Sequence, residues 1–126
     1  MSELGARLVE TFVSEWDLSG KQYRAVHIGS ANNKVVCNSQ VNLAGAFGIV
    51  LNKPSSGEAA RVAIVGFTKA ITGDTVTRNT YLVPNATGFL VAATLPGSAN
   101  VVASALESCA SGSVVNVLLM PHFRTA

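Results

Sequence analysis

The chain is rich in β-branched residues that occur in short runs separated by turn-forming residues. Val, Ile and Thr account for 30 of its 126 residues, and their branched side chains suit a pleated sheet better than a helix. Gly, Pro, Asn, Ser and Asp interrupt these runs at short intervals, as at Pro54-Ser-Ser-Gly57 and Pro84-Asn-Ala-Thr-Gly88. Short runs between regular turns predict an all-β fold, a small single-domain β-barrel or β-sandwich with an N-terminal arm.

The positions of these runs predict nine strands after the first 22 residues. Their expected ranges are 23–28, 34–38, 47–52, 60–66, 68–72, 80–83, 89–93, 99–106 and 113–120. A chain of this length suits one hydrophobic core.

Two segments of the sequence resemble each other at an offset of 55 residues. Residues 51–62 (LNKPSSGEAARV) and 106–117 (LESCASGSVVNV) each contain an apolar strand, a turn that ends in Ser-Gly, and a second apolar strand. Gly57 and Gly112 take equivalent places in these segments, and glycine readily adopts the positive φ that tight turns demand. We therefore expect both glycines in equivalent hairpin turns.

Residues 1–18 form a leader with a different character. Leu8, Phe12 and Trp16 recur every four residues as in an amphipathic helix, whereas Val9-Glu-Thr-Phe-Val13 is also typical of a strand. The leader carries four acids and one cation, whereas the remaining chain has eight cations and three acids. The sequence thus divides into an arm, residues 1–18, and a β-barrel domain, residues 19–126, and the arm is expected to bury Leu8, Phe12 and Trp16 in an assembly interface.

The composition also points to assembly. Only 13% of the residues are charged, while 48% are hydrophobic, about half the charge of a typical soluble domain. Other protein chains covering part of the surface would explain this deficit. No run approaches the ~18 apolar residues of a membrane span, and with two cysteines and no recognisable signal peptide we expect production in a reducing cytoplasm.

The residues that carry chemistry are sparse. His27, Cys37, Cys109 and His122 are the candidate zinc ligands, but they lack the close spacing by which one turn presents two ligands to a structural zinc. The sequence has no G-x-S-x-G or P-loop motif, and Glu58, Asp74 and Glu107 are the only acids beyond the leader. We therefore expect no catalytic, metal or cofactor site, and no enzymatic activity.

Single-stranded nucleic-acid binding is the alternative function for a small β-barrel. It requires a basic groove and two or three aromatic side chains on one face. Here the cations occur singly, and the aromatic residues beyond the leader are expected one per strand: Tyr23, Phe47, Phe67, Tyr81 and Phe89. The pattern favours core aromatics over a stacking platform, so nucleic acid is not an expected partner.

Three motifs, in their order along the chain, resemble the small capsid decoration (cement) proteins of phage heads. They are residues 17–26 (DLSGKQYRAV), residues 48–62 (GIVLNKPSSGEAARV), and residues 70–77 (AITGDTVT), and a closing hairpin over 105–119 follows them. The resemblance implies a β-barrel or β-sandwich virion protein with no catalytic residues. It further implies a homotrimer bound to the major capsid protein, at three-fold and quasi-three-fold positions outside an assembled shell, which it would stabilise. The leader has no counterpart among these motifs.

Overall fold

The computed structural model describes residues 7–37, 46–85, 87–92 and 99–124, and in these every regular element is a strand. All nine strands belong to one sheet, which confirms the all-β prediction. The strands are β1 (Arg7–Ser14), β2 (Ala25–Ile28), β3 (Lys34–Cys37), β4 (Gly48–Val50), β5 (Ala59–Ile71), β6 (Tyr81–Pro84), β7 (Leu90–Ala92), β8 (Ala99–Ala105) and β9 (Val114–Arg124).

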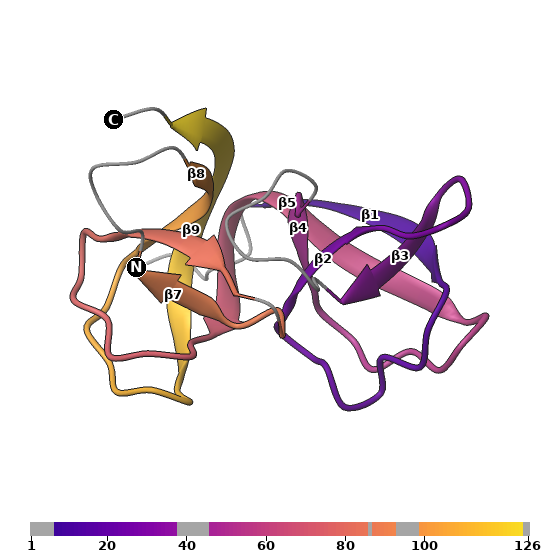
Figure 1. Ribbon diagram of the computed structural model, residues 1–126, viewed down its shortest axis with the longest axis horizontal. Coiled ribbons are helices and arrows are strands. Elements are labelled where there is room, and N and C mark those ends of the chain that lie inside the picture. The colour runs from indigo at the N-terminus through magenta and orange to yellow at the C-terminus, as the bar shows by residue number, and fades with distance from the viewer. Residues whose placement is uncertain (1–6, 38–45, 86, 93–98, 125–126) are drawn as a thin grey trace.

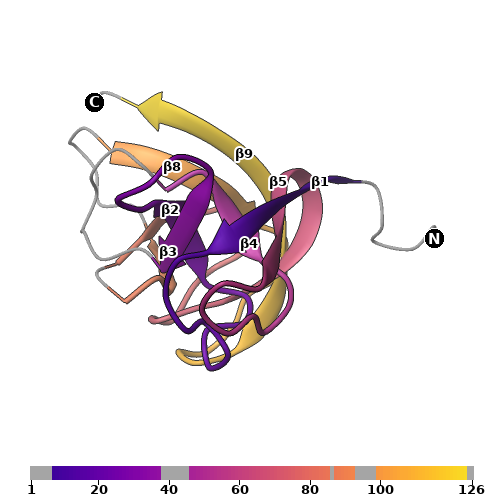
Figure 2. The same ribbon diagram turned by 90° about the vertical axis from the view of Figure 1, so that its right-hand side faces the viewer.

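Two expectations for individual strands change. The two strands expected at 60–66 and 68–72 are one continuous strand, β5, because its Gly66 and Phe67 stay in register with β9. The described part of the leader is a strand and not a helix. β1 runs antiparallel to β5 from Arg7 to Val13, so the backbone of β5 supplies its hydrogen-bond partners (Figure 2).

The first five strands close into a ring. β1 pairs with β3, β3 with β2, β2 with β4 and β4 with β5, and the N-terminal half of β5 returns to β1. All of these pairings are antiparallel except β1–β3, which is parallel. This closed ring of strands, which includes β1 of the leader, forms one lobe of the molecule (Figure 1).

The other lobe repeats this arrangement, with the C-terminal half of β5 as its first strand. That half pairs with β9, followed in order by β8, β6 and β7. A parallel bridge between Thr72 and Leu90 joins β7 to the end of β5, as the parallel β1–β3 pairing closes the first ring. β5 thus belongs to both lobes and connects them (Figure 1).

The registers of the two lobes match residue by residue. Val50 lies opposite Val62 in the β4–β5 hairpin, and Ala105 lies opposite Val117 in the β8–β9 hairpin. Both members of the second pair stand 55 residues after those of the first. The other strand pairings correspond in register as well: β1–β5 matches β5–β9, β2–β3 matches β6–β7, and β2–β4 matches β6–β8. The twelve-residue similarity in the sequence is therefore part of a duplication that spans nearly the whole chain.

The turns repeat as well. Gly57 has a φ of 86° and Gly112 a φ of 83°, and each N–H donates to the backbone carbonyl of a buried hydroxyl residue, Ser14 in the first lobe and Thr72 in the second. Both glycines lie in the loops of antiparallel hairpins. The positive φ that the sequence argument requires is present in both turns.

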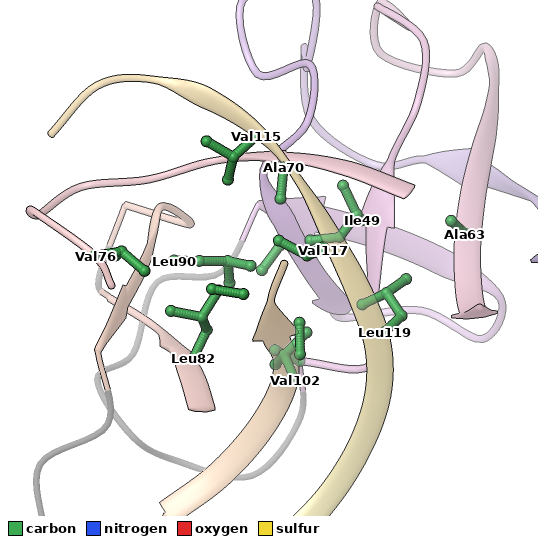
Figure 3. Close-up of a cluster of buried hydrophobic side chains, with 14 residues drawn as sticks. Ile49, Ala63, Ala70, Val76, Leu82, Leu90, Val102, Val115, Val117 and Leu119 are labelled. Atoms are coloured by element: carbon green, nitrogen blue, oxygen red, sulfur yellow. The ribbon is translucent and has the colours of Figure 1, made fainter. Parts of the chain in front are cut away.

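The two lobes have separate but adjoining cores. The smaller cluster fills the first ring and includes Leu18, Val26, Val35, Val50 and Val62, with Phe12 and Phe47 packed against it. The larger cluster combines side chains of the second lobe with Ala25, Ile49 and Ala63 from the outside of the first ring (Figure 3). The second lobe is therefore built onto the outer surface of the first.

The lobes fill equivalent positions differently. Phe12 lies opposite Ala60 in the first lobe, and the corresponding residue in the second is Ala70, opposite Val115. The Phe12 ring lies 5.3 Å from that of Phe47, at an interplanar angle of 60°. Aromatic side chains thus fill the first core from within, whereas side chains from the first lobe complete the second core.

Replacing Gly57 or Gly112 by Val is expected to lower the free energy of unfolding by on the order of 1–3 kcal/mol each. No heavy atom lies within 4 Å of an added Cβ at either glycine, so the loss arises from the positive φ and not from crowding. Chemical denaturation measures it. Gly20→Val is the matched control, because Gly20 is equally open and has no positive φ. Equal losses in all three variants would contradict the argument.

Candidate functional site

The three leader residues expected in an assembly interface occupy different environments. Leu8 is 49% exposed and Trp16 is 48% exposed, so both are available to a partner. Phe12 is half-buried and packs in the core of the first ring of its own chain. The structure therefore does not bring the three together as one exposed stripe. Phe12 lies opposite the buried Ala60, whereas Leu8 lies opposite the exposed Val65 beyond the register irregularity. Trp16 lies past the end of β1.

The leader is also integrated into the fold. Ser14 is buried, and its backbone N–H donates to the carbonyl of Glu58 over 2.9 Å. Leu18 is fully buried, and its N–H donates to the carbonyl of Pro54 over 2.8 Å. The described part of the leader is thus a structural strand of its own chain, which differs from a separate arm. Contact of its exposed side chains with a neighbour stays a prediction.

A polar contact fixes the corner that presents Trp16. The Glu15 carboxylate accepts hydrogen bonds from Ser30 at both oxygens, from the backbone N–H over 2.8 Å and from the hydroxyl over 2.7 Å. These bonds, led by that of the hydroxyl and aided by the charge of Lys34, lower the pKa of Glu15. Ile28, at the end of β2 and two residues before Ser30, is also exposed. The corner therefore offers apolar side chains on a fixed backbone.

The candidate zinc ligands are held in separate local contacts. Cys37 is buried, and its thiol donates to the carbonyl of Thr87. The sulfur of Cys109 lies 3.5 Å from the hydroxyl of Thr72, and the Nδ1 of His27 lies 2.8 Å from the carbonyl of Ile28. The side chain of His122 lies outside the described residues. Within the described part of the chain, no group of three or more His, Cys, Asp or Glu side chains is placed to hold a metal ion.

The aromatic residues of the nucleic-acid alternative are mostly covered. Tyr23, Phe47, Tyr81 and Phe89 are half-buried, and only Phe67 in that set is classed as exposed. The Arg24 guanidinium lies over the Phe89 ring, 4.1 Å from its centre. The described parts of the chain also contain no helix that is long and apolar enough to span a membrane.

Sequence reasoning missed an exposed apolar surface on the second lobe. It lies on the outside of the sheet formed by the C-terminal half of β5 with β9 and β8. Phe67 faces Leu118 across β5 and β9, and Ile71 faces Val114. The alternation of Val65, Phe67, Lys69 and Ile71 is a signal for it, but the alternate residues Thr68 and Ala70 gave no indication of which face is buried.

These features define an all-β protein of two tandem five-stranded lobes that share a strand, with exposed apolar side chains on both. The fold is similar to that of a solved phage protein, the head fiber gp8.5 N base of bacteriophage phi29. The TM-score is 0.68 at 14% sequence identity, and the match covers 90% of this chain and 93% of that chain. No protein-family model matches the sequence, and no curated protein is significantly similar to it.

The bond between Glu15 and Ser30 predicts a pH dependence of stability. Because the folded-state pKa of Glu15 is lowered, its contribution is present above the unfolded-state pKa and is lost as the pH falls through the folded-state pKa. Melting temperatures from about pH 6 to about pH 3 should fall less steeply for Glu15→Gln than for the wild type. Glu10→Gln, in the exposed part of the same leader, is the control, and a wild-type slope in Glu15→Gln would contradict the prediction.

The position of Phe12 predicts a loss of stability in the Phe12→Ala variant. Truncation of a core Phe typically costs about 3–5 kcal/mol, and we expect the lower end of that range because Phe12 is only half-buried. Urea denaturation measures the change. Thr11→Ala, at the exposed neighbouring position, should change stability by less than about 0.5 kcal/mol. A Phe12→Ala protein of wild-type stability would show that this ring does not support the core.

Proposed function

We propose that this chain is a structural virion protein that binds the outside of an assembled phage capsid and stabilises the shell. The supporting observation is the fold similarity to the phi29 head fiber base, which extends over nine-tenths of both chains. The motifs at residues 17–26, 48–62 and 70–77 support the same class independently, because their resemblance to capsid decoration proteins depends on the sequence and not on the fold. In this proposal the major capsid protein is the partner, and no catalytic step, metal or cofactor takes part.

We further propose that the protein acts as a homotrimer at three-fold and quasi-three-fold positions of the shell. Only 13% of its residues are charged, and interfaces between permanently associated subunits are apolar and poor in charge. Trimers match the symmetry of these positions, so the subunits make equivalent contacts at the three-fold positions and nearly equivalent ones at the quasi-three-fold positions. The protein is then made in the host cytoplasm and resides on the virion surface.

The leader, residues 1–18, supplies part of the assembly interface in this proposal, and residues 19–126 form the decoration domain, to which the leader contributes the strand β1. Leu8 and Trp16 contribute exposed apolar area, and Phe12 anchors the strand that carries them to the core. Because β1 closes the first ring, deletion of residues 1–17 would remove a strand of the fold. Point substitution of Trp16 therefore tests the interface more cleanly than truncation.

The proposed function predicts co-sedimentation with assembled shells of the phage that encodes the chain, and no binding to the unassembled capsid subunit. Saturating amounts of the protein should raise the temperature at which the shells disrupt, because a ligand that binds only the intact state stabilises it. Trp16→Ala should weaken shell binding by about tenfold or more, the effect of about 1.4 kcal/mol, while circular dichroism of the free protein shows that the subunit fold is unchanged.

Thr11→Ala is the control for Trp16→Ala, since Thr11 is exposed on the same leader. Failure of the wild-type protein to bind shells would refute the proposal. Tight binding of oligonucleotides with a steep salt dependence would favour the single-stranded nucleic-acid alternative instead.

A further inference from the structure

The outside of the second lobe carries a concentration of apolar side chains. Of the eight large apolar side chains that are exposed in the described chain, three lie on this sheet face: Phe67, Leu106 and Val114. Leu118, opposite Phe67, and Ile71, opposite Val114, complete the surface and are half-buried. We call these five residues the outer apolar face. Leu8 and Val65, two further exposed residues paired across β1 and β5, lie next to it along β5.

The internal duplication shows what happens to the equivalent surface of the first lobe. By strand register, Val9, Ala63 and Leu51 correspond to Phe67, Leu118 and Leu106. Those three first-lobe residues belong to the larger core or pack against it, so the second lobe covers them. The first lobe thus covers three of the five equivalent positions within the chain and leaves the other two, Val13 and Ala59, exposed, whereas the second lobe presents all five on its surface.

The outer apolar face has to be covered by another protein surface before the protein reaches a shell. A sheet face of this composition, left open in a free subunit, promotes association during the interval between synthesis and docking. The first partner available at synthesis is another copy of the same chain. Its apolar character also matches permanent subunit interfaces better than transient ones.

Charge indicates which part of the second copy fits. Lys69 is exposed between Phe67 and Ile71 on the same side of β5, and among the described residues it has no ion-pair partner. The leader holds four of the seven acids of the chain, and Trp16 and Ile28 lie exposed at its corner. Acidic and apolar groups of the leader therefore complement a face that is apolar with a cation in it.

We propose that the outer apolar face is the docking surface for the leader of a second copy of this chain. The contact joins two different surfaces, the outer apolar face of one copy and the leader corner of the next. Such heterologous contacts close into a ring when the rotation between copies closes, as a three-fold rotation does. This inference rests on the homotrimer of the proposed function and assigns its interface.

The test introduces a charge into the outer apolar face and measures the oligomeric state by sedimentation. Val114→Asp and Phe67→Asp are each expected to raise the trimer dissociation constant by at least about tenfold. Lys69→Glu should weaken the trimer as well, because it places an acid against an acidic leader. Lys53→Glu, a charge reversal at an exposed lysine on the β4–β5 loop, is its control.

The duplication supplies the control for Val114→Asp. Ala59 is the exposed first-lobe counterpart of Val114, so Ala59→Asp introduces the same charge at the equivalent strand position and should leave the trimer intact. Circular dichroism and melting temperature establish that each variant is folded. Because Val114 is 47% exposed, its substitution leaves the core unchanged, and a variant that unfolds is replaced by Val114→Ser in the same assay.

The outcomes separate this inference from the proposed function. Folded Val114→Asp and Phe67→Asp variants that dissociate while Ala59→Asp stays trimeric support the docking surface. Variants that remain trimeric but no longer bind shells would overturn it and assign the face to the capsid, leaving the proposed function intact. A wild-type protein that binds shells as a monomer would overturn the inference together with the proposed homotrimer, leaving the shell-binding role intact. One that binds no shells would refute the proposed function.

Discussion

The backbone pairing of β5 with strands on both sides of the molecule is the constraint on which the remaining structure depends. Its N-terminal half completes the first ring by pairing with β4 and β1, and its C-terminal half begins the second by pairing with β9. A register irregularity opposite Leu8 and Val9 and a φ of 105° at Gly66 mark the point where the strand passes from one lobe to the other. β-Bulges bend a strand and increase its twist, which allows one strand to serve two rings.

The same strand determines what each face of the molecule does. Residues on one side of its N-terminal half, such as Ala60 and Val62, point into the first core, and Ala63 on the other side joins the second. Past the irregularity, Ala70 faces the second core, while Phe67 lies on the outer apolar face. The side of β5 that faces the first core thus continues into the side that is exposed in the second lobe. The shared strand therefore places exposed apolar residues beside the leader.

The strand pattern was largely readable in the sequence because turn formers and β-branched runs report on local backbone preference. The duplication was visible only at residues 51–62 and 106–117, where both copies need the same Ser-Gly turn. Elsewhere the lobes preserve hydrogen-bond register, which depends on the backbone and not on side-chain identity: Phe12 and Ala70 are equivalent without being similar. The leader stayed ambiguous between helix and strand because its partner, β5, lies some fifty residues away in the sequence. Which apolar residues remain exposed depends on how the lobes pack, and no local pattern reports that.

The core of the second lobe includes side chains of the first lobe, and this has a consequence for the order in which the two lobes fold. The first ring is filled by its own side chains, including two Phe rings, and is complete once residues up to about 65 have left the ribosome. The second lobe packs small residues such as Ala70, Ala103 and Ala105 against Ile49 and Ala63 of the first. Without Ile49 and Ala63 in place, the core of the second lobe is incomplete and part of its apolar surface stays exposed. We therefore expect the N-terminal lobe to become structured first and the C-terminal lobe to fold against it.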